Sequence, residues 1–174
     1  MLQRAALGDM ANNLFSKILV PVDFSPCSEE AFRLACTLAL EFSSELLLLH
    51  VVDTKSLEAL NRLGLALPSE RKAQKKRLHH QARLFARWLM QGDAAKGLPI
   101  SRVIKEGVPF VEIARMARGE KVNLVVMGSY GGHAEGVEKI FFGSTAEKVV
   151  RTAGCPVLTV PLSAKSKQKE GAWT

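Results

Sequence analysis

Short apolar runs alternate with amphipathic stretches along most of this chain. The four clearest runs are Ile18–Val22, Leu46–Val52, Leu124–Met127 and Val157–Val160. They are apolar almost throughout instead of alternating, which is typical of strands that helices cover on both faces of a parallel sheet. A fifth run, Ile100–Ile104, carries Ser101 and Arg102 between its apolar residues. That partial alternation predicts an edge strand.

Between these runs, apolar residues recur three and four positions apart, which places them on one face of an α-helix. Three such faces consist of Phe32, Ala35, Cys36 and Ala39; of Phe110, Ile113, Ala114 and Ala117; and of Ala146, Val149, Val150 and Ala153. The longest helix is expected from about Ser69 to Gln91, and its inward residues are Leu78, Ala82, Phe85 and Leu89. We assign all four faces to the hydrophobic core.

Helix boundary signals agree with these positions. Ser25 followed by Pro26 is typical of an N-cap with proline at the first helical residue, and Pro109 opens the third helix in the same way. Gly92, Gly119 and Gly154 each follow the last periodic residue of a helix, where we expect left-handed caps.

The resulting order, β-α-β-α-β-α-β-α-β, predicts right-handed crossovers and one doubly wound α/β domain, a parallel sheet with helices on both faces. We expect this domain to span residues 15–162. Residues 1–14 are expected to be flexible, and residues 163–174 to form a flexible basic tail.

The 174 residues carry a net charge of +7. Basic residues gather at Arg71–Arg77 and again at Lys165, Lys167 and Lys169. No aromatic residues interleave with them as base-stacking platforms would, so we interpret the first group as a solvated helix face and keep nucleic-acid binding as a minor alternative. No apolar run approaches the ~20 residues of a membrane helix. Without an apolar signal segment at the start, we expect a cytoplasmic protein and no membrane partner.

The other reactive side chains form no evident catalytic or metal-binding motif. Cys27, Cys36 and Cys155 have no metal-ligand spacing and are expected to be reduced thiols. His50 is interpreted as a buried, hydrogen-bonded residue. His79 and His80 are adjacent on a helix, so they point in different directions and make a poor metal pair. We therefore predict no catalytic residue and no metal ligand.

Candidate chemistry lies where two strands end, because ligands of open parallel sheets bind beyond the carboxyl ends of the strands. The first strand ends at Asp23, and the fourth runs into Gly128-Ser-Tyr-Gly131. Gly143-Ser-Thr145 then opens the last helix. Glycines let the backbone approach an anion closely, and a helix N-terminus offers unpaired N–H groups. The pattern favours a phosphate cradle, although neither a P-loop nor a GxGxxG motif is present.

Several of these segments resemble the universal stress protein family. The resemblance is carried by Lys17-Ile-Leu-Val-Pro-Val-Asp-Phe-Ser25, Glu106-Gly-Val-Pro-Phe-Val-Glu-Ile113, Asn123-Leu-Val-Val-Met-Gly-Ser-Tyr-Gly131, Gly143-Ser-Thr-Ala-Glu-Lys-Val-Val150 and Cys155-Pro-Val-Leu-Thr-Val160. It implies a five-stranded sheet in the order 3-2-1-4-5, a homodimer paired through Val157–Val160, and binding of ATP, with or without Mg²⁺. By resemblance, the residues around the adenosine would be Pro21, Val22, Asp23 and Val51. Those lining the phosphates would be Met127, Gly128, Gly131, Gly143, Ser144 and Thr145.

One departure from the family pattern leaves two functions open. Nucleotide-binding members usually read G-x2-G-x9-G-[ST], whereas eleven residues separate Gly131 from Gly143 here. The two extra residues would either form a bulge, using Gly132 and Gly136, or fold into the phosphate site. The first outcome predicts an ATP-binding regulatory or stress-response module with at most slow hydrolysis. The second predicts a nucleotide-free dimeric scaffold that acts through protein–protein contacts.

Overall fold

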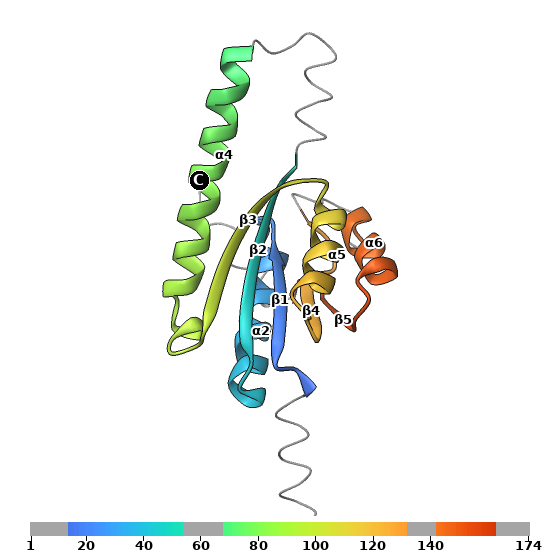
Figure 1. Cartoon of the computed structure of the whole chain (residues 1–174). Coiled ribbons are helices and arrows are strands. Elements are labelled where there is room, and N and C mark those ends of the chain that lie inside the picture. Colours follow the sequence, from blue (N-terminus) through green and yellow to red (C-terminus); the bar gives the residue numbers. More distant parts are fainter. Residues whose placement is uncertain (1–13, 54–67, 132–141, 163–174) are drawn as a thin grey trace, which may run out of the picture.

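The computed structural model describes residues 14–53, 68–131 and 142–162. Within these ranges the chain alternates strands and helices in the expected order (Figure 1). The strands are β1 (Lys17–Val22), β2 (Glu45–Asp53), β3 (Ile100–Gly107), β4 (Leu124–Gly128) and β5 (Val157–Val160). The helices are α2 (Pro26–Phe42), α4 (Pro68–Gln91), the short 3₁₀ turn η1 (Asp93–Ala95), α5 (Pro109–Gly119) and α6 (Ser144–Thr152).

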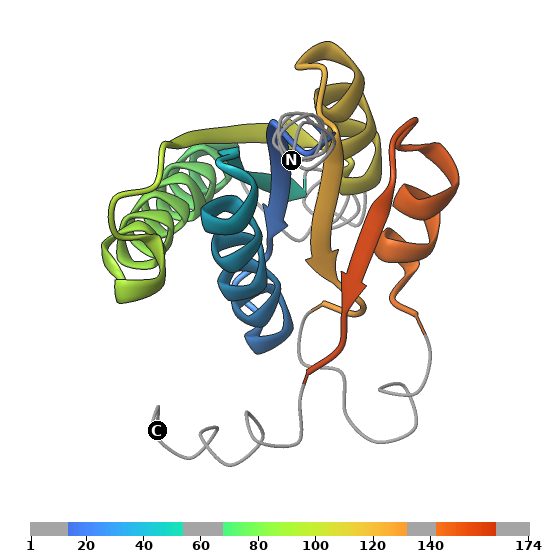
Figure 2. The same cartoon turned by 90° about the horizontal axis from the view of Figure 1, so that it is seen from below.

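The five strands form one parallel sheet in the order β3-β2-β1-β4-β5, which confirms the expected fold class. Helices α2 and α4 cover one face and α5 and α6 the other, as the view along the sheet shows (Figure 2). The chain moves outward from β1 to β3, then crosses back over β1 to β4. The direction of winding therefore reverses between β1 and β4.

The core lies in two layers, one on each side of the sheet. Ile18 and Val20 of β1 belong to the layer under α2 and α4, whereas Leu19 between them belongs to the layer under α5 and α6. Successive residues of a strand point to opposite faces, so a central strand with both faces covered must be apolar at every position. This is why β1, β2 and β4 appear in the sequence as continuous apolar runs.

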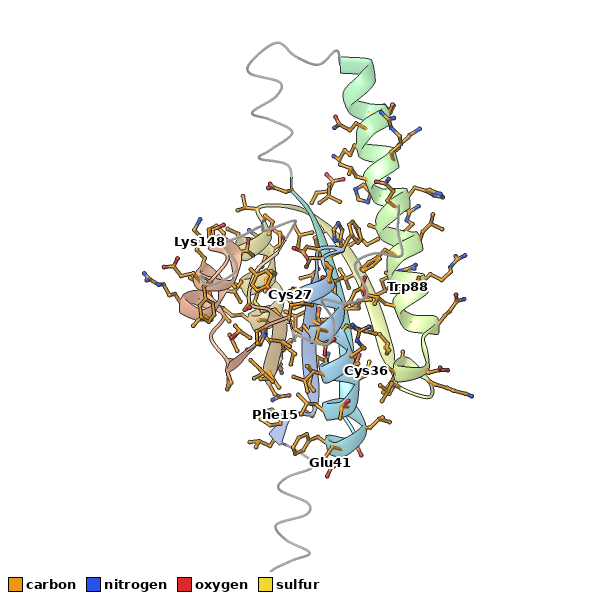
Figure 3. All side chains as sticks on the ribbon, turned by 180° about the vertical axis from the view of Figure 1, so that it is seen from behind. Phe15, Cys27, Cys36, Glu41, Trp88 and Lys148 are labelled. Atoms are coloured by element: carbon orange, nitrogen blue, oxygen red, sulfur yellow. The ribbon has the colours of Figure 1, made fainter. Side chains whose placement is uncertain are left out.

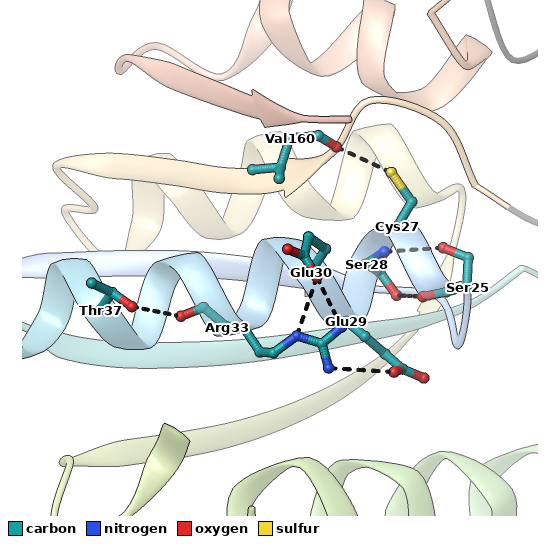
Figure 4. Close-up of polar contacts among 8 residues, drawn as sticks. All are labelled: Ser25, Cys27, Ser28, Glu29, Glu30, Arg33, Thr37 and Val160. Atoms are coloured by element: carbon teal, nitrogen blue, oxygen red, sulfur yellow. Dashed lines mark hydrogen bonds and ion pairs between the residues drawn. The ribbon is translucent and has the colours of Figure 1, made fainter. Parts of the chain in front are cut away.

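The start of α2 follows the sequence signals closely (Figure 4). Ser25 is the N-cap, and its Oγ accepts a hydrogen bond from the Ser28 backbone N–H at 3.2 Å. Pro26 occupies the first helical position. The Cys27 thiol donates to the Val160 carbonyl at 3.1 Å and so connects this helix start to the end of β5.

The prediction of a left-handed helix cap is wrong at two of the three glycines. Gly92 has a φ of −65° and caps the N-terminus of η1, because the chain enters a new turn as α4 ends. Gly119 is the last residue of α5, and the left-handed conformation falls two residues later, on Lys121 (φ 53°). Gly154 does adopt the expected left-handed conformation, with a φ of 79°.

The edge strand β3 is longer than its sequence pattern indicated. It pairs with β2 from Ile100 to Gly107, three residues beyond the predicted end at Ile104. The charged residues of the extension, Lys105 and Glu106, are tolerated because both side chains are exposed to solvent. Among the described helices, none is long and apolar enough to cross a membrane.

Candidate functional site

A pocket of about 330 Å³ opens at the carboxyl end of the sheet, where the winding reverses between β1 and β4. This volume is at the lower end of the range of about 300–1,000 Å³ typical of small-molecule sites. All ten residues predicted from the sequence line it: Pro21, Val22, Asp23, Val51, Met127, Gly128, Gly131, Gly143, Ser144 and Thr145. The fold thus brings both predicted groups together, and their roles in binding remain predictions.

Six further residues complete the lining and were missed by sequence reasoning. They are Ser28, Leu49, Pro109, Ile113, Tyr130 and Ala146. Tyr130 lies inside the glycine motif Gly128–Gly131, and this position in the sequence could have identified it as a pocket residue. Ile113 was assigned to the core by its helical spacing, and it is indeed 3% exposed. Nothing local in the sequence shows that one edge of a core residue also faces a pocket.

Three helix N-termini meet at this pocket. The residues that bring them there are Ser28 of α2, Pro109 of α5, and Ser144 and Thr145 of α6. The N-cap of α6, Gly143, provides no side-chain hydrogen bond. Glu147 is the first residue of α6 whose N–H bonds to a carbonyl, that of Gly143, so within the described part of the chain the N–H groups of Ser144, Thr145 and Ala146 have no backbone or capping acceptor. Such groups and the positive ends of the helix dipoles favour an anion.

The turn after β1 holds an acidic side chain at the pocket. The Asp23 Oδ1 accepts hydrogen bonds from the Ser25 backbone N–H at 3.1 Å and from the Ser25 hydroxyl at 2.5 Å. Phe24 between them has a φ of 69°, which is uncommon for a residue with a side chain. The N-cap of α2 thus also orients Asp23, the one charged residue among the described lining residues.

Gly131 and Gly143 of the pocket lie in close contact with other parts of the protein. A Cβ on Gly131 would overlap with the Asp23 Oδ2, and one on Gly143 would lie 3.0 Å from the Tyr130 Cα. The sequence had suggested that these glycines make room for a ligand. In the structure they first make room for the turn after β1 and for the β4–α6 connection, and the pocket forms between them.

His50 supports the pocket from the opposite face of the sheet, as a buried and hydrogen-bonded residue in agreement with the sequence prediction. It is 9% exposed, and its Nδ1–H donates to the Val22 carbonyl at 2.8 Å. Its ring stacks on Phe24 with a centroid distance of 4.3 Å, and Phe85 of α4 packs edge-on against Phe24. His50 therefore connects β2 to the turn that carries Asp23.

Burial lowers the pKa of His50, and the nearby His79 of α4 acts in the same direction. The Val22 carbonyl and the Asp23 carboxylate oppose the shift, and Glu106 of β3 faces His79 at 2.7 Å. Because the folded state releases the His50 proton more readily than the unfolded state, the neutral ring stabilises the fold above the unfolded pKa near 6.5. This stabilisation is lost as the pH falls below that value.

We therefore expect the urea midpoint of unfolding to decrease as the pH is lowered through the histidine range, and His50→Gln to weaken this dependence. Glutamine retains a donor for Val22 but has no proton to bind. The matched control is His80→Gln, because His80 is exposed on α4. A His50→Gln variant with the full pH dependence of the unmodified protein would contradict this assignment.

The cysteines of the described residues show no sign of a reactive thiol. Cys27, Cys36 and Cys155 carry free thiols. Burial raises the pKa of Cys36 to about 11 and also raises that of Cys155, which disfavours the reactive thiolate. Within the described ranges, no three His, Cys, Asp or Glu side chains are grouped as metal ligands.

Two parts of the sequence prediction lie outside the described residues. The first is the lengthened loop, of which residues 132–141, with Gly132, His133 and Gly136, are not described. The second is the predicted basic tail, residues 163–174.

Comparisons with known proteins point to one family. The sequence model of the universal stress protein family matches residues 14–161. Universal stress protein MJ0531 of Methanocaldococcus jannaschii is 36% identical over 151 residues, covering 85% of this chain and 83% of its own. The solved structure of protein MJ0577, from the same organism, is 27% identical with a TM-score of 0.70, covering 84% of this chain and 96% of its own.

Two more distant solved structures have the same fold and hold ligands. A universal stress protein in complex with cAMP is 20% identical with a TM-score of 0.55, over 86% of this chain and 98% of its own. One from Archaeoglobus fulgidus in complex with dAMP is 18% identical with a TM-score of 0.50, over 84% of this chain and 98% of its own.

Proposed function

Because this chain belongs to the universal stress protein family, we propose that it binds ATP in the pocket between β1 and β4 and acts as a regulatory, stress-response module. The observation that carries the proposal is the convergence of three helix N-termini on one pocket with apolar walls. Backbone N–H groups and helix dipoles recognise phosphates without a lysine. Apolar walls formed by residues such as Pro21 and Val51 suit a flat base. The cAMP and dAMP complexes of two relatives support an adenine nucleotide as the ligand.

The two ends of the nucleotide have separate places in this proposal. Pro21, Val22 and Val51 surround the adenosine beside Asp23. The phosphates lie between the glycine turn after β4 and the first turn of α6, where Ser144 and Thr145 add hydroxyl groups. Mg²⁺ would enter with the phosphates, because it is usually held by one or two carboxylates together with phosphate oxygens. Asp23 supplies the only carboxylate of the described lining.

The residues that line the pocket suit the binding of ATP better than its hydrolysis. Efficient phosphoryl transfer uses a cationic side chain on the phosphates and a residue that orients the attacking water. The described lining contains no lysine or arginine, and Asp23 is held by its bonds to Ser25. We therefore assign Asp23 to binding and expect at most slow hydrolysis.

Isothermal titration calorimetry with ATP tests the proposal directly. We expect heat of binding at one site per chain, with GTP as the control for base recognition. The variant Gly131→Val, whose Cβ overlaps with the Asp23 Oδ2, should show no heat. Absence of ATP uptake by the unmodified protein would reject the proposal and favour a scaffold that has lost its ligand.

We further propose that the protein is a homodimer paired through β5. This strand is at the edge of the sheet, and Leu158 within it is 38% exposed. An unpaired apolar edge strand is a template for another strand, and pairing with a second copy would cover it. Light scattering is expected to give twice the 19.0 kDa chain mass. A monomer at high protein concentration would contradict this pairing.

A further inference from the structure

Helix α4 carries a strong positive charge that the rest of the described protein does not balance. Residues 72–91 include no aspartate or glutamate, and their lysines and arginines are Lys72, Lys75, Lys76, Arg77, Arg83 and Arg87. All six are exposed. Of these six, only Lys75 has an ion-pair partner among the described residues, Glu106 of β3. Five cations are therefore available to an external anion.

These cations are arranged in a line. Lys72, Lys76, Arg83 and Arg87 follow one flank of the helix at intervals close to whole turns, and span about 22 Å. Figure 3 shows nitrogen-tipped side chains projecting outward along α4 after its first turn. The face toward the sheet is formed by other residues, including the buried Ala82, Ala86 and Leu89.

Two apolar residues are exposed beside this basic flank. Leu84 is 51% exposed and Trp88, one turn later, is 49% exposed. The Trp88 ring contacts Phe85 at a centroid distance of 5.6 Å, which anchors it without covering it. Both residues lie away from the sheet, on a part of α4 that packs well. Their exposure is therefore a property of the surface and not of a frayed helix end.

The shape of this surface is convex. The first half of α4 extends beyond the end of the sheet (Figure 1), and five of the six residues 72–77 are exposed. A convex ridge matches a flat, deformable surface without needing a complementary groove. A nucleic acid would satisfy the cations, and a single strand would also stack a base on Trp88, but neither a duplex nor a single strand gives the exposed Leu84 an apolar environment.

We propose that α4 docks this protein onto the surface of a bilayer that contains anionic lipids. Lysines and arginines close to such a surface each contribute electrostatic attraction, and tryptophan is favoured at the boundary between headgroups and acyl chains. Leu84 and Trp88 provide the apolar contact, and the aligned cations provide the charge complementarity. The expectation of no membrane partner rested on the lack of a spanning segment, and a helix that lies on the surface needs none. This inference does not depend on nucleotide binding.

Trp88 also provides the probe, because Trp173 is the only other tryptophan of the chain. In a Trp173→Phe background, vesicles of phosphatidylserine and phosphatidylcholine should bind the protein in co-sedimentation and shift the Trp88 emission to shorter wavelength. Vesicles of phosphatidylcholine alone should do neither. Failure to bind the anionic vesicles, or binding with an unchanged Trp88 emission, would overturn the proposal.

A pair of charge-matched variants locates the contact. Replacing Lys72, Lys76 and Arg87 with glutamine should weaken vesicle binding about 100-fold. Replacing Lys165, Lys167 and Lys169 with glutamine removes the same charge from the C-terminal segment and should have a much smaller effect. Equal losses in the two variants would assign the binding to net charge and overturn the proposal. So would a single-stranded oligonucleotide that binds the unmodified protein when anionic vesicles do not.

Discussion

Replacing Gly131 with valine is expected to abolish the rise in melting temperature that saturating ATP produces in the unmodified protein. A ligand present at one hundred times its dissociation constant stabilises the folded state by about 2.7 kcal/mol. For a chain of this size, that corresponds to a rise of about 5–10 °C. A Cβ at position 131 overlaps with the Asp23 Oδ2. The valine therefore displaces Asp23 and places a branched side chain beside the proposed phosphate site.

Differential scanning fluorimetry with and without ATP measures this effect, and the variant should still fold. Asp23 is exposed, so its side chain can move aside without disturbing the core. The matched control is Gly119→Val, because a Cβ at Gly119 meets no atom within 4 Å. This control should keep the full ATP-dependent shift. A Gly131→Val protein that retains the shift would show that ATP, if bound, does not use this turn.

The second large effect concerns the core. Replacing Phe32 with alanine is expected to lower the free energy of unfolding by about 3–5 kcal/mol. Phe32 is 1% exposed and belongs to the cluster between α2 and the sheet, so its removal leaves a cavity that its neighbours fill only partly. Domains are typically stable by only about 5–15 kcal/mol, so this one substitution removes a large part of the total.

Urea unfolding followed by circular dichroism provides the measurement, and the same helix provides the control. Leu40 lies eight residues later on α2 and is 63% exposed. Leu40→Ala should change the stability by no more than about 0.5 kcal/mol. If the two alanine variants lost similar stability, the assignment of Phe32 to the core and of Leu40 to the surface would be wrong.

Sequence patterns predicted the individual elements well because they reflect local geometry. The apolar runs around Leu19, Leu47 and Val125 are strands, and the N-cap at Ser25 with Pro26 starts α2 as expected. The errors occur where neighbouring elements decide the backbone. Gly119 resembles a helix cap, yet Lys121 takes the left-handed conformation as the chain turns toward β4.

The candidate site was predicted only in part, because local motifs identify some of its residues and not others. Residues such as Asp23 and Gly131 stand in recognisable motifs at strand ends, and all ten predicted residues line one pocket. Leu49 and Ile113 carry no such signal, because an apolar residue has the same pattern whether it faces only the core or also a pocket. The role of Gly131 as space for Asp23 was equally invisible, since the contact joins residues more than a hundred positions apart.

By itself, the sequence determined which segments form strands and helices and which of their faces are apolar. Its motifs also determined the family to which the chain belongs. These properties depend on neighbours within a few positions along the chain, where the periods of helix and strand apply. Only the tertiary structure decided that three helix N-termini meet at one pocket, that His50 supports the turn bearing Asp23, and that Leu84 and Trp88 of α4 remain uncovered. These arrangements depend on packing between distant segments, which no local pattern records.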